Sequence, residues 1–333
     1  MRQVAIRAVN GLLSRAVRGR LAPLSNLYPW QRQDKSVWTS RATTDVVEDQ
    51  DSRLADLRAR YRNVDARVTT PAVWDEAIVS DADRRNFRGD TQYVYQRANM
   101  NLNEIACALS YWWLKAGRAR DLLETLKEDG AFGALTIELD GRLVSRDLLD
   151  SDGEIDFLRR HTPLGRQSMS LIDIGAGYGR LAHRLDEAVG STTRILATDA
   201  FAASTMLSER YLAFRKSDAR VVPLDEVEAE LAATPIDIAT NIHSFSECTV
   251  EAIEWWVERL AAANVRYLMV VPNRSSADGQ RCLTNENQDM SAIFERFGYH
   301  LVVREPRHDD PFVQRFGMDP CTFFLFARTE QAG

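Results

Sequence analysis

The residues best suited to bind a cofactor form a glycine-rich segment in the middle of the chain. Asp173 lies within the largely apolar run of residues 170–174, and Gly175, Gly177 and Gly179 continue from it at alternate positions. Glycine lets the backbone turn tightly and come close to a bound molecule. If residues 170–174 are a parallel strand, that molecule lies at the carboxyl edge of the sheet, where α/β proteins bind nucleotide-like ligands.

The spacing of these glycines separates two kinds of nucleotide-binding loop. The dinucleotide fingerprint is G-x-G-x-x-G, and its third glycine allows close packing of helix on strand. Counted from Gly175 and Gly177, that third position holds Arg180, and the last glycine stands one residue earlier. A nicotinamide-dependent oxidoreductase is therefore disfavoured. The alternative for this segment is a glycine-rich turn between a strand and a helix that binds no ligand.

This segment resembles motif I of the class I S-adenosylmethionine-dependent methyltransferases. In that family an acidic residue two positions before the first glycine orients the loop that faces the methionine moiety of the cofactor, and Asp173 has this position. The resemblance implies S-adenosyl-L-methionine as the cofactor. The contacts that it implies are Asp173, Gly175, Ala176, Gly177 and Gly179.

A second carboxylate ends the next apolar run. Residues 194–199 predict a strand that finishes at Asp199, and Ala200 follows it. A ribose needs an acidic hydrogen-bond acceptor at the end of this strand, so Asp199, with Ala200 beside it, is the candidate ribose contact. The alternative is that Asp199 caps the helix expected at 201–215, because Asp is a favoured N-cap residue.

His243 and Glu247 are the candidate catalytic residues. Methyl transfer from a sulfonium is an in-line displacement, so the enzyme holds a nucleophile opposite the leaving sulfur and removes its proton. Histidine titrates near neutral pH and suits a hydroxyl acceptor. Four residues apart at the start of a helix, the two side chains would share a face, where the carboxylate orients the imidazole. The alternative for His243 is a cap or a packed ring, and Asn241 is predicted to touch the cofactor.

Three further residues are candidates for contacts with the acceptor. Arg274 follows the strand expected at 266–271. His308 lies in the connection between the last two expected strands, and such loops often reach substrates. Tyr95, or Tyr93 as the alternative, precedes the sheet, in a segment that commonly covers the cofactor in this fold. The carboxylates beside His308 have no spacing that defines a metal site, so no metal is predicted.

Three segments together narrow the resemblance. Residues 143–149, 173–179 and 241–247 look like a bacterial group of sugar O-methyltransferases, over roughly the last two-thirds of the chain. One departure is Asp173, where many methyltransferases have Glu, although either carboxylate accepts hydrogen bonds. The resemblance implies methylation of a saccharide hydroxyl with His243 in the base-like position. A polyketide or lipid hydroxyl as the acceptor, and a non-catalytic cofactor-binding partner subunit, remain open.

Apolar runs that alternate with amphipathic segments predict an α/β fold. The resemblance implies a Rossmann-like, seven-stranded class I methyltransferase sheet with an N-terminal, mainly helical accessory region. The expected units are a basic amphipathic helix at 1–33, an accessory or lid region with a small hairpin at 34–165, and the cofactor-binding domain at 166–333. Strands are expected at 170–174, 194–199, 220–224, 236–240, 266–271, 300–304 and 322–327.

Composition limits the partners. The 333 residues carry 42 basic and 48 acidic side chains, a net charge of −6. General nucleic-acid binding needs a basic surface, so no nucleic-acid partner is expected. No run of apolar residues approaches the roughly 18 that a membrane span needs. The four cysteines are scattered along the chain and are expected to be free, reduced thiols.

The N-terminal residues differ from the rest of the chain in charge. Residues 1–33 hold six arginines and no acid around apolar positions. They could lie on an anionic membrane surface, form a cleavable targeting peptide or dock on protein. The expected location is the cytoplasm, at most peripheral to the inner face of the membrane, and a homo-oligomer is compatible with the sequence.

Overall fold

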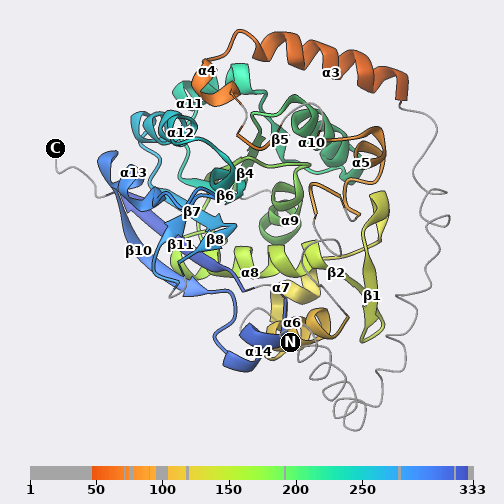
Figure 1. The fold of residues 1–333 in the computed structure, drawn as a ribbon. Coiled ribbons are helices and arrows are strands. Elements are labelled where there is room, and N and C mark those ends of the chain that lie inside the picture. Colours follow the sequence, from red (N-terminus) through yellow and green to blue (C-terminus); the bar gives the residue numbers. More distant parts are fainter. Residues whose placement is uncertain are drawn as a thin grey trace, which may run out of the picture.

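The computed structural model describes residues 47–70, 72–74, 78–89, 91–94, 104–117, 120–190, 193–276, 279–318 and 320–328. Within these ranges the chain forms a central sheet with helices packed around it (Figure 1). The basic helix predicted at 1–33 and the candidate contact Tyr95 lie outside the described residues. None of the helices in these ranges is long and apolar enough to cross a membrane.

The central sheet contains seven strands in the order β10-β11-β7-β6-β3-β4-β5. Strand β11 runs antiparallel to both of its neighbours, and the other pairs are parallel. This order is that of the class I methyltransferase sheet, so the predicted fold class is confirmed. The strands are Met169–Ile174 (β3), Thr193–Thr198 (β4), Arg220–Val221 (β5), Ile238–His243 (β6), Tyr267–Pro272 (β7), Tyr299–Pro306 (β10) and Thr322–Arg328 (β11).

Burial explains why most of these strands can be predicted. All six residues of β3 are buried, and a parallel strand that is covered on both faces reads as a continuous apolar run. Strand β5 is shorter than the predicted 220–224. Pro223 follows it, cannot donate to a ladder, and starts the 3-10 turn η4 (Leu224–Glu226).

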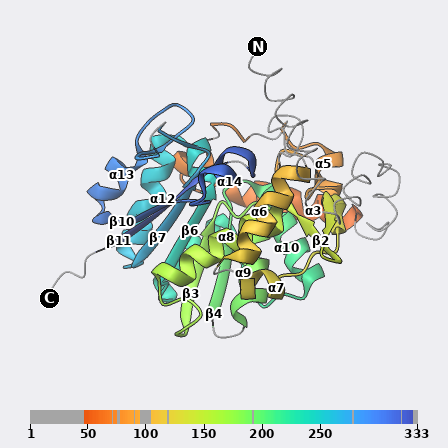
Figure 2. The same cartoon turned by 90° about the horizontal axis from the view of Figure 1, so that it is seen from below.

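Helices cover both faces of the sheet (Figure 2). One layer contains α8 (Arg146–His161), α9 (Arg180–Val189) and α10 (Ala202–Arg215), in which α9 contacts both of the others. The opposite layer contains α11 (Val227–Ala233), α12 (Val250–Ala262) and α13 (Met290–Arg296), in which α12 contacts both of the others. The short 3-10 helix η5 (Ser244–Glu247) connects β6 to the second layer.

The N-terminal elements pack around this core. They are α3 (Val47–Tyr61), α4 (Ala66–Thr69), α5 (Asp81–Arg85), α6 (Glu104–Ala116), α7 (Arg120–Thr125) and η2 (Ala131–Gly133). The predicted hairpin is confirmed by β1 (Thr136–Leu139) and β2 (Arg142–Ser145). Near the C-terminus are β8 (Arg274–Ser275), β9 (Cys282–Leu283) and α14 (Pro311–Phe316). Helix α3 packs on α10 and α4 packs on α12, so the N-terminal segment bridges the two helical layers.

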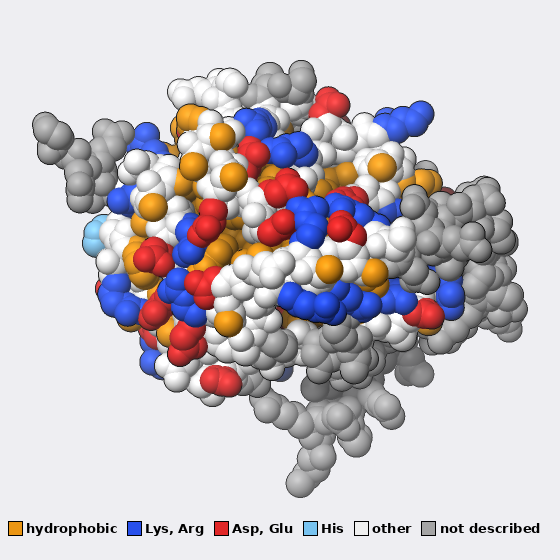
Figure 3. All heavy atoms as spheres, turned by 90° about the horizontal axis from the view of Figure 1, so that it is seen from above, with side chains coloured by type: hydrophobic (Ala, Val, Ile, Leu, Met, Phe, Trp, Pro, Cys, Tyr) orange, Lys and Arg blue, Asp and Glu red, His pale blue; other side chains and the backbone are white. Residues whose placement is uncertain are grey.

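Specific polar contacts attach α3 to the core. The Tyr61 hydroxyl lies 2.8 Å from Thr205 Oγ1 and accepts a hydrogen bond of 2.9 Å from the backbone N–H of Leu224. Arg53 donates to Glu209 on α10 through two nitrogens, at 2.9 and 2.6 Å. Acidic and basic side chains lie side by side over this face of the molecule (Figure 3).

Candidate functional site

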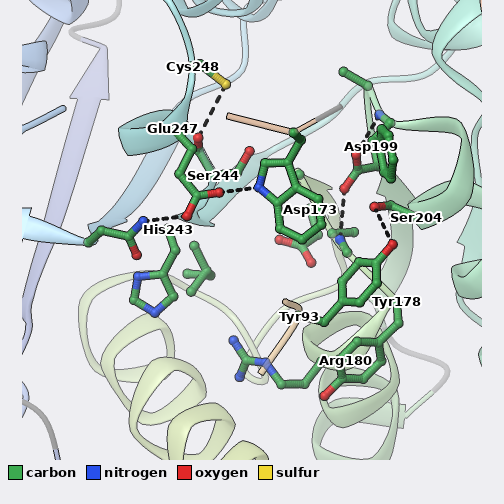
Figure 4. Close-up of a pocket in the computed structure, with 18 of the residues that line it drawn as sticks. Tyr93, Asp173, Tyr178, Arg180, Asp199, Ser204, His243, Ser244, Glu247 and Cys248 are labelled. Atoms are coloured by element: carbon green, nitrogen blue, oxygen red, sulfur yellow. Dashed lines mark hydrogen bonds between the residues drawn. The ribbon is translucent and has the colours of Figure 1, made fainter. Parts of the chain in front are cut away.

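A large cavity of about 990 Å³ opens at the carboxyl edge of the sheet. The ends of β3, β4, β6 and β7 contribute to its wall, together with α8 and the segments around α3 and α4. Ligands of open α/β sheets bind at this edge, and the volume is in the range of small-molecule sites, roughly 300 to 1,000 Å³. Figure 4 shows its central part.

The glycine-rich loop lies between β3 and α9. Gly175, Gly177 and Gly179 all have positive φ, at 70°, 59° and 82°, a backbone region that glycine adopts without a steric penalty. The N–H groups of Gly175 and Ala176 both donate to the Thr198 carbonyl, at 2.9 and 3.1 Å, which fixes the loop against β4. At Gly175 a Cβ atom would lie 2.2 Å from Ser244 Oγ, so a side chain has no room there.

Gly179 lies outside the cavity wall. Gly175, Ala176 and Gly177 line the cavity, whereas Gly179 does not. Its missing Cβ would lie 2.8 Å from Ser208 Oγ on α10, so this glycine allows α9 and α10 to pack closely. A direct contact of Gly179 with the cofactor stays a prediction.

Two carboxylates flank the loop, that of the buried Asp173 and that of the half-buried Asp199. Asp173 accepts a hydrogen bond of 2.7 Å from Thr240 Oγ1, and Asp199 accepts from the N–H groups of Gly177 and Phe201, at 2.9 and 2.8 Å. Burial raises the pKa of each carboxyl to about 7, against these hydrogen bonds. Both side chains line the cavity, and Ala200 lines it beside Asp199. Asp199 thus faces the cavity and also holds the N-terminal start of α10.

His243 is the last residue of β6 and lines the same cavity. Its φ and ψ are 69° and −34°, a strained backbone for a residue with a side chain. Such strain is concentrated at functional sites. Within the described residues Nδ1 of the ring is buried and has no hydrogen-bond partner. Burial lowers the pKa of His243 to about 4, although the nearby Asp150 opposes this shift, so the ring is neutral at pH 7.

Glu247 does not orient His243, and the predicted pair is wrong. Residues 244–247 form the 3-10 helix η5 rather than the first turn of an α-helix. The Glu247 carboxylate instead accepts hydrogen bonds from Trp74 Nε1 at 2.5 Å and from Asn273 Nδ2 at 2.7 Å. It still lines the cavity, above the glycine loop.

Asn241 holds two parts of the sheet edge together. Its side chain is fully buried and is absent from the cavity wall. Its amide nitrogen donates to the Ile174 carbonyl at 2.9 Å, and its amide oxygen accepts from the Phe245 N–H at 2.7 Å. Asn241 therefore fixes the end of β3 to the turn after β6, and its contact with the cofactor stays a prediction.

Aromatic side chains form the cavity wall beside the loop. The ring centroid of Trp74 lies 5.1 Å from that of Tyr93 and 5.8 Å from that of Phe201. The Tyr93 hydroxyl lies 3.3 Å from Ser204 Oγ. The sequence analysis did not predict Trp74, because two of its partners, Glu247 and Phe201, are more than a hundred residues away in the chain.

The remaining acceptor candidates are His308 and Arg274. The His308 ring packs edge-on against Trp113, with 5.0 Å between centroids, and does not line the cavity. Its neighbour Arg307 does, and a contact of His308 with the acceptor stays a prediction. Arg274 belongs to β8, and its side chain is outside the described part of the structure. The described residues contain no group of three or more His, Cys, Asp or Glu side chains placed to hold a metal ion.

Solved structures with a similar fold include methyltransferases of low identity. A SAM dependent methyltransferase from Aquifex aeolicus is 16% identical over 54% of this chain and 90% of its own, with a TM-score of 0.41. TrmN from Thermus thermophilus is 16% identical over 58% of this chain and 55% of its own, with a TM-score of 0.38. The magnesium protoporphyrin IX methyltransferase ChlM of Synechocystis PCC 6803, solved with bound SAM, is 14% identical over 65% and 94%, with a TM-score of 0.37. No protein-family model and no curated protein matches the chain.

Proposed function

We propose that this protein is an S-adenosylmethionine-dependent O-methyltransferase. One observation carries the proposal: the glycine loop after β3 and the Asp199 carboxylate after β4 face one cavity in a sheet with the methyltransferase strand order. Gly175 and Gly177 let the cofactor approach the backbone, and Asp199 has two carboxylate oxygens for the ribose hydroxyls. Asp173 places negative charge where the cationic methionine moiety would lie, because its side chain lines the cavity beside the loop.

The acceptor in this proposal is a hydroxyl group, and His243 is its base. When bound, the cofactor supplies a methyl group on a positively charged sulfur. The neutral imidazole of His243 accepts the hydroxyl proton as the oxygen forms its bond to the methyl carbon and the carbon–sulfur bond breaks, so the electron pair goes to sulfur. The ring of His243 lines the cavity in which the acceptor hydroxyl would bind. The sugar character of the acceptor rests on the resemblance of residues 143–149, 173–179 and 241–247 to sugar O-methyltransferases.

Two measurements on the purified full chain test this function. Calorimetric titration with S-adenosylhomocysteine should give saturable binding, and NAD should not bind. His243→Ala should bind S-adenosylhomocysteine like the wild type and lose methyl transfer to a panel of glycosides by about a hundredfold or more. The matched control is His300→Ala, because His300 is exposed on β10.

The results separate the proposal from its rivals. Tight binding of NAD without binding of S-adenosylhomocysteine would contradict the donor. Normal donor binding with equal turnover in wild type and His243→Ala would contradict the base. A wild type that binds the donor and methylates no glycoside or other hydroxyl compound would favour a non-catalytic partner subunit.

A further inference from the structure

The glycine loop contains one bulky residue. Tyr178 stands between Gly177 and Gly179, whose φ angles are 59° and 82°, and it is only 3% exposed. Its hydroxyl donates a hydrogen bond of 3.0 Å to Asp147 Oδ2, in the first turn of α8. The loop is therefore attached by a buried side chain to a helix that precedes the sheet.

The Asp147 carboxylate is itself held in one orientation. Besides the bond from Tyr178, it accepts hydrogen bonds from Arg88 Nε at 2.8 Å, from Ser145 Oγ at 2.5 Å and from Arg184 Nη2 at 3.3 Å. A carboxylate has about four acceptor positions, and these donors are enough to occupy them. Loss of one donor would leave part of a buried carboxylate without a partner, which is costly. The hydroxyl of Tyr178 thus has a defined place in the structure.

The ring of Tyr178 is enclosed by other aromatic side chains. Its centroid lies 5.1 Å from that of Phe87, 6.3 Å from that of Tyr93 and 5.4 Å from that of Tyr211 on α10. Figure 4 shows the Tyr93 and Tyr178 rings next to each other. Phe87 and Tyr93 belong to the accessory region before the sheet, as does Arg88. This region and α10 therefore fix the ring together.

Tyr178 directly follows a backbone contact of the proposed donor site. The N–H of Gly177 donates to Asp199 Oδ2 at 2.9 Å, and Asp199 is the proposed partner of the ribose hydroxyls. A displaced Tyr178 would move the peptide group of Gly177 and, with it, the Asp199 carboxylate. The contacts around Asp147 thus reach the donor site through Tyr178.

The composition of the loop favours such an anchor. Three glycines within residues 175–179 leave the backbone many conformations, and fixing one of them costs conformational entropy. If the loop is already held in its bound conformation, the ligand does not have to pay this cost. A hydrogen bond from Tyr178 to a carboxylate that is itself fixed holds the loop in this way.

We propose that Tyr178 and Asp147 are positioning residues for the donor. Their hydrogen bond holds the glycine loop in the conformation that binds S-adenosylmethionine, and the accessory region supports it through Phe87 and Arg88. This inference rests on the proposed function, and it adds that segments before the sheet set the affinity for the donor. It also gives a role to residues 143–149 of the sequence resemblance, because this segment contains Asp147.

The test compares two variants in which a tyrosine loses a hydrogen bond to a carboxylate. Tyr178→Phe removes the bond to Asp147. Tyr111→Phe removes a bond of 3.1 Å to Asp140 from a residue on α6 that is 2% exposed and does not line the cavity. Both variants should lower the midpoint of unfolding in urea. In calorimetric titration of the full chain, Tyr178→Phe should bind S-adenosylhomocysteine about tenfold more weakly, as expected for a lost hydrogen bond to a charged group, and Tyr111→Phe should bind it like the wild type.

A third variant separates positioning from direct contact, because Tyr178 lines the cavity and Phe87 does not. Phe87→Leu loosens the packing on the Tyr178 ring. It should weaken binding of S-adenosylhomocysteine by roughly threefold or more, in line with the energy of an aromatic pair. The matched control is Phe324→Leu, since Phe324 on β11 is also fully buried and does not line the cavity. This control should bind S-adenosylhomocysteine like the wild type.

The other outcomes overturn the inference or the function beneath it. A purely structural role would lower the urea midpoint of Tyr178→Phe and leave its affinity for S-adenosylhomocysteine unchanged, and an equal loss of affinity in Tyr111→Phe would have the same meaning. Weak binding by Tyr178→Phe with normal binding by Phe87→Leu would show that the hydroxyl contacts the donor directly. If Tyr178→Phe does not fold, Phe87→Leu and its control decide. Failure of the wild type to bind S-adenosylhomocysteine would overturn the proposed function itself.

Discussion

Binding of the donor should release protons, because two carboxyl groups at its proposed site are half protonated at neutral pH. Burial raises the pKa of Asp173 and of Asp199 to about 7. The ammonium group that S-adenosylhomocysteine shares with the donor, placed beside Asp173, and ribose hydroxyls on Asp199 both favour the ionised form. At pH 7 each carboxyl then loses about half a proton, so about one proton is released for each bound S-adenosylhomocysteine.

The number of protons released should depend on pH. With both pKa values near 7, the release should approach about two protons at pH 6 and fall to a few tenths at pH 8. The affinity for S-adenosylhomocysteine should therefore weaken as the pH falls below 7. Calorimetry in two buffers of different ionisation enthalpy measures the number directly, since the observed heat changes by the protons released times the buffer enthalpy.

Variants assign the protons to the two carboxyl groups. Asp173→Asn should remove about half of the release at pH 6, and the matched control Asp218→Asn should change nothing, because Asp218 is exposed. Binding of S-adenosylhomocysteine at pH 6 with no proton release, or with proton uptake, would refute the reasoning. Either result would mean that the ligand does not reach the two carboxyl groups or meets them already ionised.

Three further predictions concern the loop, the base and the aromatic wall. Gly175→Ala should lower the free energy of unfolding in urea by about 2 kcal/mol or more, because its Cβ would lie 2.2 Å from Ser244 Oγ. The double variant Gly175→Ala/Ser244→Gly should recover part of this free energy. No recovery would contradict the contact between the two residues. At saturating donor, kcat should decrease on the acidic side with a midpoint near pH 4 rather than 6.5, because burial lowers the pKa of His243 to about 4 and the neutral ring is the active form. A midpoint near pH 6.5 would exclude His243 as the base. Trp74→Phe should lower the free energy of unfolding by about 1 to 3 kcal/mol, because the half-buried Glu247 carboxylate loses a hydrogen-bond donor. An unchanged midpoint of unfolding in urea would contradict this prediction.

The elements that can be predicted from sequence are those whose burial is local and periodic. Strand β3 is apolar throughout because both of its faces are covered, and the positive φ of Gly175 and Gly177 is a property that few other residues provide. Asp199 follows from the same logic, since it directly follows a buried strand. Together these features indicate the fold and the donor half of the cavity.

The acceptor half depends on contacts between distant segments, and there sequence reasoning fails. His243 has a positive φ, so the chain turns sharply at the end of β6. Residues 243 and 247 therefore do not lie one α-helical turn apart, which was the reason to expect a pair of His243 with Glu247. The true partner of Glu247 is Trp74, 173 positions away in the chain. Between the adjacent residues Arg307 and His308, only the conformation after β10 decides which side chain enters the cavity.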